Sequence, residues 1–483
     1  MSETVHFGTD GWRGRIGFDF NVENLRRVAA ATANHFSARG VRSAVVGFDR
    51  RFLSGRFARQ VAEVFGSLGV HTLLSGCDLP TPALSWAVAS RQPSFGVMIT
   101  ASHNPPEFNG YKIKDSDGAS IEDATAHGIE SRLLQGAPSA LPAGAPPPEP
   151  AVEDLLPPYL AALSERVDLE RIRARDWTIV SDAMHGCGGN LLELLLRGGR
   201  ARVRTLRGTR DVLFGGQPPE PTPEHLREAA SLLASGQASV GLATDGDGDR
   251  IAALDENGTF VGAQILTPLL ALHLHEARGA RGAVAKTFAH TVLLDRVASE
   301  LGVSLHVRPI GFKHLAALMR TEPILVCGEE SGGIGVAGFL PERDGLLCAL
   351  LVLEDLCLRN VSLAQAASDL RRRFGDYHYL RVDLRSEPQA GRAAVERLAA
   401  QLPSRIGGLS VRGVDRLDGL KCLFGDDGWI LFRQSGTEPV LRVYTEVRGR
   451  QYLQGVLDQG VEMLARHLPA PPQSARQSPS CGS

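Results

Sequence analysis

Residues 95–105 read Phe-Gly-Val-Met-Ile-Thr-Ala-Ser-His-Asn-Pro, an apolar segment that ends in a sharp polar turn. A short apolar run of this kind is typical of a strand buried on both faces of a parallel sheet. The turn places Ser102 at the carboxyl end of this strand, where open α/β sheets bind their ligands. A serine hydroxyl needs a base, a metal ion or prior phosphorylation to react. Taken alone, these residues favour an ordinary turn over a catalytic one.

The residues before this strand repeat a strand–helix pattern. The expected elements are strands at Ala44–Phe48 and His71–Leu74 and helices at Ser54–Leu68 and Ala83–Ala89. The first helix is amphipathic, and Ser54 is a typical N-cap residue for it. Strands and helices that alternate in this order predict a mostly parallel sheet covered by helices.

Similar blocks follow this one, and together they predict three similar mixed α/β domains and a C-terminal α+β domain around a central cleft. Gly136–Pro150 is rich in Pro, Ala and Gly and is expected to be a linker or a long loop. Residues 469–483 carry no large apolar side chain, which predicts a disordered tail. We expect the four domains at residues 1–140, 151–253, 254–375 and 376–468.

The composition is ordinary for a globular protein, with 43% hydrophobic and 22% charged residues in a chain of 483. The formal net charge of -2 and the absence of basic blocks argue against a nucleic-acid partner. A polar start and the lack of a run of about 18 apolar residues predict no signal peptide and no membrane span. The seven scattered cysteines are typical of reduced thiols. We expect a cytoplasmic protein that is a monomer or a homodimer.

Three aspartates alternate with glycines in Asp245-Gly246-Asp247-Gly248-Asp249-Arg250. The glycines let the backbone curl so that alternate side chains converge. Converging carboxylates repel one another unless a divalent cation lies among them, and oxygen ligands suit Mg²⁺ or Ca²⁺. An EF-hand is excluded because its sixth position requires Gly and holds Arg250, and because a strand precedes the loop. Three carboxylates leave room for a phosphoryl oxygen, which is typical of Mg²⁺ sites.

Two further polar loops follow apolar strands. Gly328-Glu329-Glu330-Ser331-Gly332-Gly333 offers groups that suit sugar hydroxyls, although an acidic capping loop fits it equally well. Arg433-Gln434-Ser435-Gly436-Thr437-Glu438-Pro439, with Arg442 beyond it, offers donors that suit a phosphate but lacks the spacing of a Walker P-loop. Each of the four blocks thus carries one such loop. Together they offer a hydroxyl, a metal site, groups for a sugar and a clamp for a phosphate, which indicates phosphoryl transfer on a phosphosugar.

These four loops, in this order, resemble those of the alpha-D-phosphohexomutase superfamily. The likeness includes Phe7-Gly8-Thr9-Asp10-Gly11-Trp12-Arg13-Gly14 and spans about Phe7 to Glu446. The resemblance implies four domains around a deep cleft, a phosphoserine, one Mg²⁺ per chain and a bisphosphorylated sugar intermediate. It also implies interconversion of hexose 1-phosphate and hexose 6-phosphate, most closely as in phosphoglucomutases, with glucose 1,6-bisphosphate or an equivalent as activator.

The resemblance implies roles for individual residues. Ser102 would be the phosphoserine, and its phosphate would complete the metal site of Asp245, Asp247 and Asp249. Lys112 resembles the family's proton-transfer lysine, and His103 lies near it in sequence. The residues implied to bind the substrate are Arg13, Arg250, Gly311, Lys313, Glu329, Ser331, Arg433, Ser435, Gly436, Thr437 and Arg442.

Two positions depart from the family's patterns. Phosphomannomutase and phosphoglucosamine mutase branches often end the sugar loop in His, where this chain has Gly333. Phosphoglucomutases have a lysine in the motif that reads Glu342-Arg343-Asp344-Gly345 here. Arg343 is the catalytic candidate at that place, but an arginine stays protonated, so the second acid/base group is left open. The Glu-Glu-Ser form of the sugar loop favours glucose, with mannose or glucosamine phosphate as alternatives.

Two other functions use the same kind of chain. A sugar-phosphate sensor that has lost catalysis should lack Ser102 or one of the aspartates, and this chain has them all. A Mg²⁺-dependent phosphatase would use the same groups but would release inorganic phosphate instead of isomerising the sugar.

Overall fold

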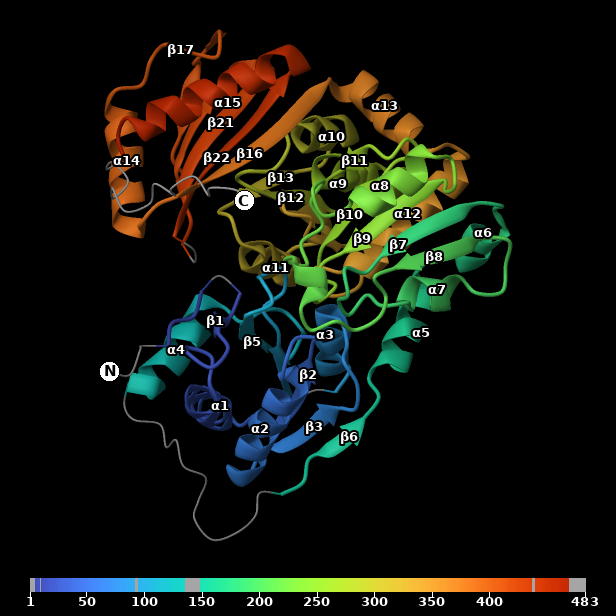
Figure 1. The fold of residues 1–483 in the computed structure, drawn as a ribbon, viewed down its shortest axis with the longest axis vertical. Coiled ribbons are helices and arrows are strands. Elements are labelled where there is room, and N and C mark those ends of the chain that lie inside the picture. Colours follow the sequence, from blue (N-terminus) through green and yellow to red (C-terminus); the bar gives the residue numbers. More distant parts are fainter. Residues whose placement is uncertain (1–4, 9, 92–93, 135–147, 437–438, 469–483) are drawn as a thin grey trace, which may run out of the picture. The chain divides into compact units, whose positions relative to one another are not determined.

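The computed structural model describes residues 5–8, 10–91, 94–134, 148–436 and 439–468 (Figure 1). The chain divides into two compact units, Met1–Phe374 and Gly375–Ser483. Three mixed α/β sheets build the first unit and an antiparallel sheet with helices builds the second, which confirms the predicted fold class. The predicted linker at Gly136–Pro150 falls mostly outside the described residues, and the predicted disordered tail at 469–483 lies wholly outside them.

The first sheet is built around the apolar segment Phe95–Ile99, which is buried along its whole length. The strands lie in the order β1 (Trp12–Arg15), β5 (Phe108–Lys114), β4 (Phe95–Ile99), β2 (Ser43–Phe48), β3 (His71–Ser75) and β6 (Ala151–Glu153). All are parallel except β5 and β1, which run antiparallel to their neighbours. The helices are α1 (Val22–Ser37), α2 (Ser54–Ser67), α3 (Thr81–Ala89) and α4 (Asp123–Leu134). Phe95 stacks on Phe36 of α1 with ring centroids 4.2 Å apart, so sheet and helices share one core.

The second sheet has the same plan. Its strands lie in the order β11 (Phe260–Val261), β10 (Ile251–Leu254), β9 (Val240–Thr244), β7 (Thr178–Asp182) and β8 (Arg202–Leu206). The strands β9, β7 and β8 are parallel, and β10 and β11 are antiparallel. The helices are α5 (Leu156–Arg166), α6 (Leu169–Ala174), α7 (Leu191–Leu196) and α8 (Arg227–Ala234). In Figure 1, α5 follows β6 and leads the chain from the first sheet to the second.

The third sheet orders its strands β13 (Leu305–Arg308), β12 (Ala283–Thr287), β14 (Ile324–Gly328) and β15 (Ile334–Val336). Only β15 is antiparallel to its neighbour. The helices are α9 (Ala263–Leu272), α10 (Leu293–Leu301), α11 (Phe312–Thr321), α12 (Gly345–Arg359) and α13 (Leu363–Phe374).

One loop position recurs in all three sheets. A buried parallel strand ends in a polar loop, and the chain returns as an antiparallel strand: β4 to β5, β9 to β10 and β14 to β15. The three loops span residues 100–107, 245–250 and 329–333, and they carry Ser102, the aspartates and the predicted sugar-binding residues. Each loop therefore leaves the carboxyl end of its strand, where ligands bind in sheets of this kind.

The second unit is an antiparallel sheet in the order β16 (Tyr377–Arg385), β22 (Val440–Arg448), β21 (Gly428–Gln434), β20 (Leu420–Leu423) and β19 (Gly413–Asp415). The helices α14 (Pro388–Ala400) and α15 (Arg450–Ala465) pack on it. A short hairpin, β17 (Arg405–Ile406) and β18 (Leu409–Ser410), completes the unit. Phe432 and Val443 lie in the core between sheet and helices.

One expected detail is wrong. Ser54 is the first residue of α2 and not its N-cap, a position that Leu53 occupies with a left-handed φ of 62°. The hydroxyl of Ser54 donates instead to Asp49 Oδ1 at 2.6 Å. The buried Asp49 carboxylate follows β2 and needs donors, so it takes the hydroxyl that would have capped the helix.

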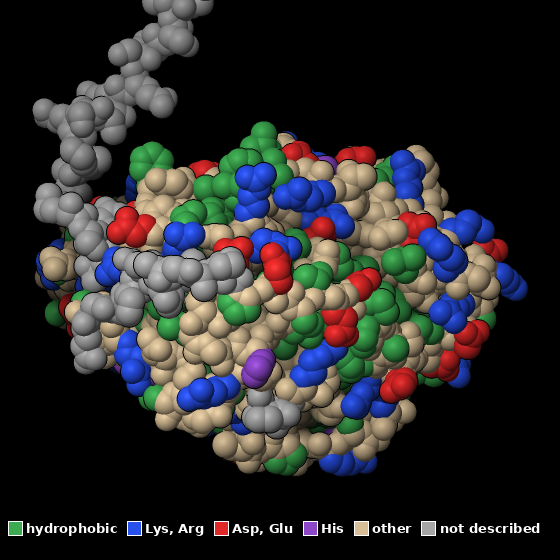
Figure 2. All heavy atoms as spheres, turned by 90° about the horizontal axis from the view of Figure 1, so that it is seen from below, with side chains coloured by type: hydrophobic (Ala, Val, Ile, Leu, Met, Phe, Trp, Pro, Cys, Tyr) green, Lys and Arg blue, Asp and Glu red, His purple; other side chains and the backbone are tan. Residues whose placement is uncertain are grey.

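The surface mixes charges of both signs. Figure 2 shows acidic and basic side chains interspersed over one face of the molecule, in keeping with the net charge of -2. No helix within the described ranges is long and apolar enough to cross a membrane. Six cysteines lie in the described part of the chain and are free thiols, and the seventh, Cys481, lies outside it.

A buried charge cluster joins the second and third sheets. The imidazole of His273, at the end of α9, lies 2.7 Å from Glu354 and 3.4 Å from Asp355, both on α12. Glu354 also accepts the backbone N–H of Asp168, which precedes α6. Burial works against the charged imidazole, but the two carboxylates outweigh it and raise the pKa of His273. The charged imidazole therefore stabilises the packing of α12.

His273→Asn should lower the free energy of unfolding by about 2 kcal/mol, because it removes the buried cation between Glu354 and Asp355 and leaves them only the partly exposed Arg278 and Arg359. The pKa of His273 is raised in the folded state, so its contribution is complete below about pH 6.5 and declines as the pH rises through the raised value. Thermal midpoints of wild type and variant at about pH 6 and about pH 9 test this. The difference between them should be larger at the lower pH, and a difference that does not change with pH would contradict the assignment.

Candidate active site

Ser102 has an unusual backbone. Its φ of 51° lies in the left-handed region, which costs a non-glycine residue about 1–3 kcal/mol and is found most often at functional sites. The side chain is buried, and its hydroxyl donates to Asp245 Oδ2 at 2.7 Å. His103 Nδ1 lies 3.4 Å from the same hydroxyl. The structure therefore brings the predicted nucleophile against the predicted metal site.

Arg51, which follows β2 and is fully buried, holds the loop at residues 100–107 that carries Ser102, called the serine loop below. Its guanidinium donates to the carbonyl oxygens of Ser102 and Asn104, both at 2.6 Å, to that of Pro105 in the same loop, and to that of Phe108 at the start of β5. Asp49 lies 3.2 Å from Arg51 Nε and balances the charge. One arginine thus fixes three carbonyls of the loop, including that of Ser102, so the strained conformation of Ser102 is supported from outside the loop.

The three aspartates converge as predicted. The carboxylates of Asp245, Asp247 and Asp249 are fully buried, and one oxygen of each lies within 4.8 Å of the others. Gly246 is required here, because a Cβ would lie 2.5 Å from the carbonyl oxygen of Ser102. Thr81, the first residue of α3, donates to Asp247 Oδ2 at 2.6 Å and ties the aspartate loop to that helix.

The carboxylate oxygens fit a divalent cation. Within the described residues, Oδ1 of Asp247 and Oδ1 of Asp249 are buried and accept no hydrogen bond. Buried acceptors without a partner are rare and point to a missing ion. Burial raises the pKa of Asp245 well above its usual range, and the two neighbouring carboxylates raise it further. A cation among the three carboxylates would bind the oxygens that lack a donor and would offset the repulsion between the carboxylates. Oxygen ligands of this kind suit Mg²⁺.

Lys112 lies on β5 and reaches the same carboxylates. Its Nζ is 2.8 Å from Asp247, and 2.9 Å from both Asp249 and Asp10. Burial works against the ammonium, but these three carboxylates outweigh it and raise the pKa of Lys112 above its usual range. Lys112 is therefore a cation in this arrangement.

Arg343 is the centre of the ion network. Its guanidinium lies 2.6 Å from Asp10, 2.7 Å from Asp249 and 3.2 Å from Glu329. These carboxylates come from residues before the first sheet, from the second sheet and from the third. Burial opposes the charge of Arg343, yet the carboxylates hold its pKa well above the usual range. A group that stays charged cannot exchange protons, so Arg343 acts as a fixed charge.

The neighbours of Arg343 are held as firmly. Glu342 forms an ion pair with the buried Lys114 of β5. Asp344 caps α12 by accepting the backbone N–H of Leu347, and its two oxygens lie 2.9 and 2.8 Å from the hydroxyl of Tyr159 on α5. Burial raises the pKa of Asp344 to about 6, although both hydrogen bonds lower it. Strand β5, helix α5 and the third sheet thus meet at Glu342-Arg343-Asp344.

Gly333 explains how Arg343 fits. A Cβ at residue 333 would lie 2.3 Å from Cδ of Arg343 and 3.1 Å from a carboxylate oxygen of Glu329. The arginine side chain therefore passes directly over the glycine. The two departures from the family's patterns are parts of one packing arrangement, in which Arg343 fills the space that a side chain at residue 333 would need.

The sugar loop brings Glu329 into the network and leaves Ser331 half-buried. Burial raises the pKa of Glu329 to about 7, and the positive charge of Arg343 opposes the shift. When a hydroxyl group displaces water from the Glu329 carboxylate, the carboxylate can accept a strong hydrogen bond from it.

Four other predicted residues lie around this centre. Arg13 donates to Asn104 of the serine loop at 2.5 Å. Arg250 follows the aspartates and lies 3.5 Å from Glu220. Gly311 precedes α11 with φ 128°, a backbone angle that favours glycine. Lys313 of α11 pairs with Asp123 of α4 at 2.5 Å, so it is engaged with the first domain.

The predicted phosphate clamp belongs to the second unit. Arg433 and Arg442 are directly opposite each other on β21 and β22, although like charges in this position repel. Asp418 lies 2.9 Å from Arg433 and Asp383 lies 3.3 Å from Arg442. Ser435 is buried, and a Cβ at Gly436 would meet open space. Thr437 lies outside the described residues.

Sequence reasoning missed several residues of this centre. They are Asp10, Arg51, Thr81, Lys114, Tyr159, Glu342 and Asp344. Asp10, Glu342 and Asp344 stand inside the motifs quoted above, so their charge was a usable signal. Tyr159 and Lys114 had no recognisable signal in the sequence, because their partners lie more than 180 residues away.

Family comparisons cover nearly the whole chain. Residues 4–139, 157–258 and 262–374 match alpha/beta/alpha domains I, II and III of the phosphoglucomutase/phosphomannomutase family, and residues 384–462 match its C-terminal domain.

Individual relatives agree. A phosphoglucomutase/phosphomannomutase of Thermococcus kodakarensis is 29% identical over 96% of this chain and 99% of its own. The phosphoglucosamine mutase of Mycobacterium marinum is 31% identical over 91% of this chain and 94% of its own. A solved structure from Thermus thermophilus, assigned as a phosphomannomutase, is 33% identical with a TM-score of 0.86, and the match covers 96% of this chain and all of that one.

Gly333→Ala should lower the stability of the protein by about 2 kcal/mol, because the new methyl group overlaps Arg343. Thermal midpoints measure the effect. Gly455→Ala is a matched control, since a Cβ there would have no neighbour within 4 Å.

The same substitution made in an Arg343→Ala background should have almost no further effect, because the overlapping atoms are gone. An equal loss in both backgrounds would show that the strain at residue 333 does not come from Arg343.

Proposed function

Because this chain belongs to the phosphoglucomutase/phosphomannomutase family, we propose that it moves a phosphoryl group between O1 and O6 of a hexose and that Ser102 carries the group in transit. The chain is a phosphohexomutase, that is, an isomerase. The observation that carries the proposal for Ser102 is its placement: a strained, buried serine whose hydroxyl lies 2.7 Å from the aspartate cluster.

We place Mg²⁺ among Asp245, Asp247 and Asp249, with the phosphate of Ser102 as a further ligand. Bound there, the ion would polarise the transferring phosphoryl group and offset the negative potential that surrounds Lys112. The support is the pair of buried carboxylate oxygens without partners.

The cycle begins with Ser102 phosphorylated. The free hydroxyl of a hexose monophosphate attacks the phosphorus, the bond to Ser102 Oγ breaks, and a hexose bisphosphate results. The sugar turns within the site, and its other phosphoryl group returns to Ser102. Arg13 and Arg250 would supply fixed positive charge near the serine and Arg343 beside Asp249, which would stabilise the charge spread over the transferring oxygens. Glucose 1,6-bisphosphate would activate the enzyme by charging Ser102.

Lys112 is proposed to take the proton of the attacking hydroxyl and to return it in the second half of the cycle. In the ion network around Asp10 and Asp247 it is protonated, so it acts as a base only when those contacts change. His103 lies beside the serine and is proposed as its polar neighbour in the proton path. Arg343 is proposed as an electrostatic group rather than an acid or base.

The remaining predicted residues are proposed to bind the substrate. Glu329 and Ser331 suit adjacent sugar hydroxyls. Gly311 and Lys313 would contribute through the start of α11. Arg433 and Arg442, with Ser435, Gly436 and Thr437, would bind the phosphate that is not reacting. The opposed arginines of β21 and β22 support this, because two guanidinium groups on neighbouring strands suit the binding of one phosphate.

Glucose phosphate is the proposed substrate, on the basis of the Glu329-Glu330-Ser331 sequence. Glucosamine phosphate is a second candidate, since a relative of 31% identity is named a phosphoglucosamine mutase. Mannose phosphate is a third, since the solved structure from Thermus thermophilus reported above is assigned as a phosphomannomutase.

Turnover of glucose, mannose and glucosamine 1-phosphates by the purified enzyme will rank these substrates. We expect kcat/KM for glucose 1-phosphate to exceed the other two by at least about tenfold, the scale set by one sugar substituent. A higher value for glucosamine would reassign the substrate. Release of inorganic phosphate in place of isomerisation would indicate a phosphatase.

Ser102→Ala should reduce mutase turnover by more than about a thousandfold, because the group that forms the covalent intermediate is gone. Intact-protein mass spectrometry after incubation with glucose 1,6-bisphosphate should show one added phosphoryl group on wild type and none on the variant. Ser235→Ala, an exposed serine beyond α8, is the matched control and should still be labelled. Labelling of Ser102→Ala would move the carrier to another residue.

A further inference from the structure

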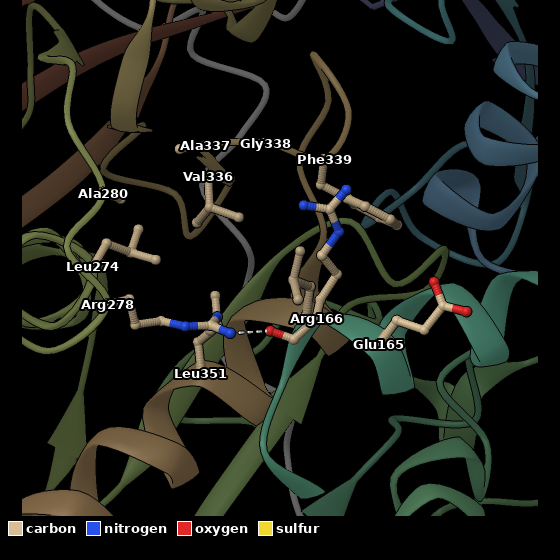
Figure 3. A pocket seen from close by; sticks show the side chains of 11 residues that line it. Glu165, Arg166, Leu274, Arg278, Ala280, Val336, Ala337, Gly338, Phe339 and Leu351 are labelled. Carbon is tan, nitrogen blue, oxygen red and sulfur yellow. Dashed lines mark hydrogen bonds between the residues drawn. The ribbon is translucent and has the colours of Figure 1, made fainter.

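A cavity lies between the end of α5 and the segment that follows β15 (Figure 3). Its volume is about 360 Å³, within the range of small-molecule sites. None of its lining residues belongs to the catalytic, metal or substrate sets described above. One wall, residues 336–339, continues towards Glu342 and Arg343. The cavity is therefore separate from the active site but borders the segment that carries Arg343.

The inner wall of the cavity is apolar. Leu347 and Leu351 contribute side chains from α12, Leu274 from the turn that follows α9, and Val336 from the end of β15. All four are at least nine-tenths buried, so each exposes only a small part of its surface to the cavity. A bound molecule with an apolar body would cover that part, at roughly 25 cal/mol for each Å² removed from water.

Two guanidinium groups border the same space. Arg166, the last residue of α5, lies over the ring of Phe339 at 5.7 Å from its centroid and has no carboxylate partner among the described residues. Arg278 donates to the backbone oxygen of Arg166 and lies 3.6 Å from Glu354, so its position is fixed. Figure 3 shows both side chains beside the hollow, with the carboxylate of Glu165 pointing away from Arg278.

We propose that this cavity binds a small organic monoanion, a carboxylate on an apolar body of about two rings. The body would pack on the leucine wall, and the carboxylate would lie between Arg166 and Arg278. A planar carboxylate matches the guanidinium fork. Glu354 already pairs with Arg278, and Glu165, an acidic residue of the lining, points away from it, so the carboxylate of the ligand would pair with the charge of Arg166.

Isothermal titration calorimetry with 1-naphthoate and its uncharged isostere 1-naphthamide tests the proposal on the full-length enzyme. We expect 1-naphthoate to bind at one site per chain and about tenfold more tightly than the amide, the value of one charge-assisted interaction. Arg166→Met keeps the apolar contact with Phe339 but removes the charge, so it should abolish this preference. Arg200→Met, at an exposed arginine outside the cavity, should leave it unchanged.

Two controls make the outcome decisive. Mutase turnover of Arg166→Met within about twofold of wild type will show that the variant is folded. Ala280→Phe fills the cavity without changing its charge and should prevent binding of both compounds. Equal affinity for acid and amide, or binding that Arg166→Met leaves intact, would overturn the proposal. So would displacement of 1-naphthoate by excess glucose 1,6-bisphosphate with no effect of Ala280→Phe, since the compound would then occupy the active site.

Discussion

The first unit depends on one buried cation, the guanidinium of Arg343. It lies within 3.2 Å of Asp10, Asp249 and Glu329, carboxylates from three separate parts of the chain. Without it Glu329 would lose the cation beside it, and Asp10 and Asp249 would be left to share Lys112. A buried charge left unpaired costs about 3–5 kcal/mol. The supports on either side, Lys114 with Glu342 and Tyr159 with Asp344, keep the arginine in that position. The contacts that hold the sheets together are therefore the same contacts that set the charge distribution of the site.

Repetition of one topology explains how so many functional groups meet. Three times the chain runs along a parallel strand, turns through a polar loop and returns antiparallel, and each loop carries a different set of predicted functional residues. Since the loops occupy equivalent places in their sheets, side-by-side sheets bring them together without long excursions. Ser102 and Asp245, 143 residues apart in sequence, share a hydrogen bond for this reason.

The parts of this site that the sequence revealed are those encoded locally. The apolar runs in the sequence predicted the strands β4, β9 and β14. The polar residues directly after these strands pointed to Ser102 and the aspartates as site residues. Arg51 and Tyr159 could not be found this way, because their value lies in partners 51 to 185 residues away. The prediction of Ser54 as an N-cap was wrong for a related reason. Its hydroxyl bonds to the buried carboxylate of Asp49 instead of capping the helix.

The contact between Gly333 and Arg343 has a consequence for divergence within such enzymes. A side chain at residue 333 forces a long arginine at residue 343 to move, since a Cβ there would lie 2.3 Å from Cδ of Arg343. A lineage that exchanges an arginine at residue 343 for a histidine at residue 333 is therefore expected to shorten the first side chain before it acquires the second. Substitutions at the two positions are expected to be coupled, because each side chain needs the space of the other.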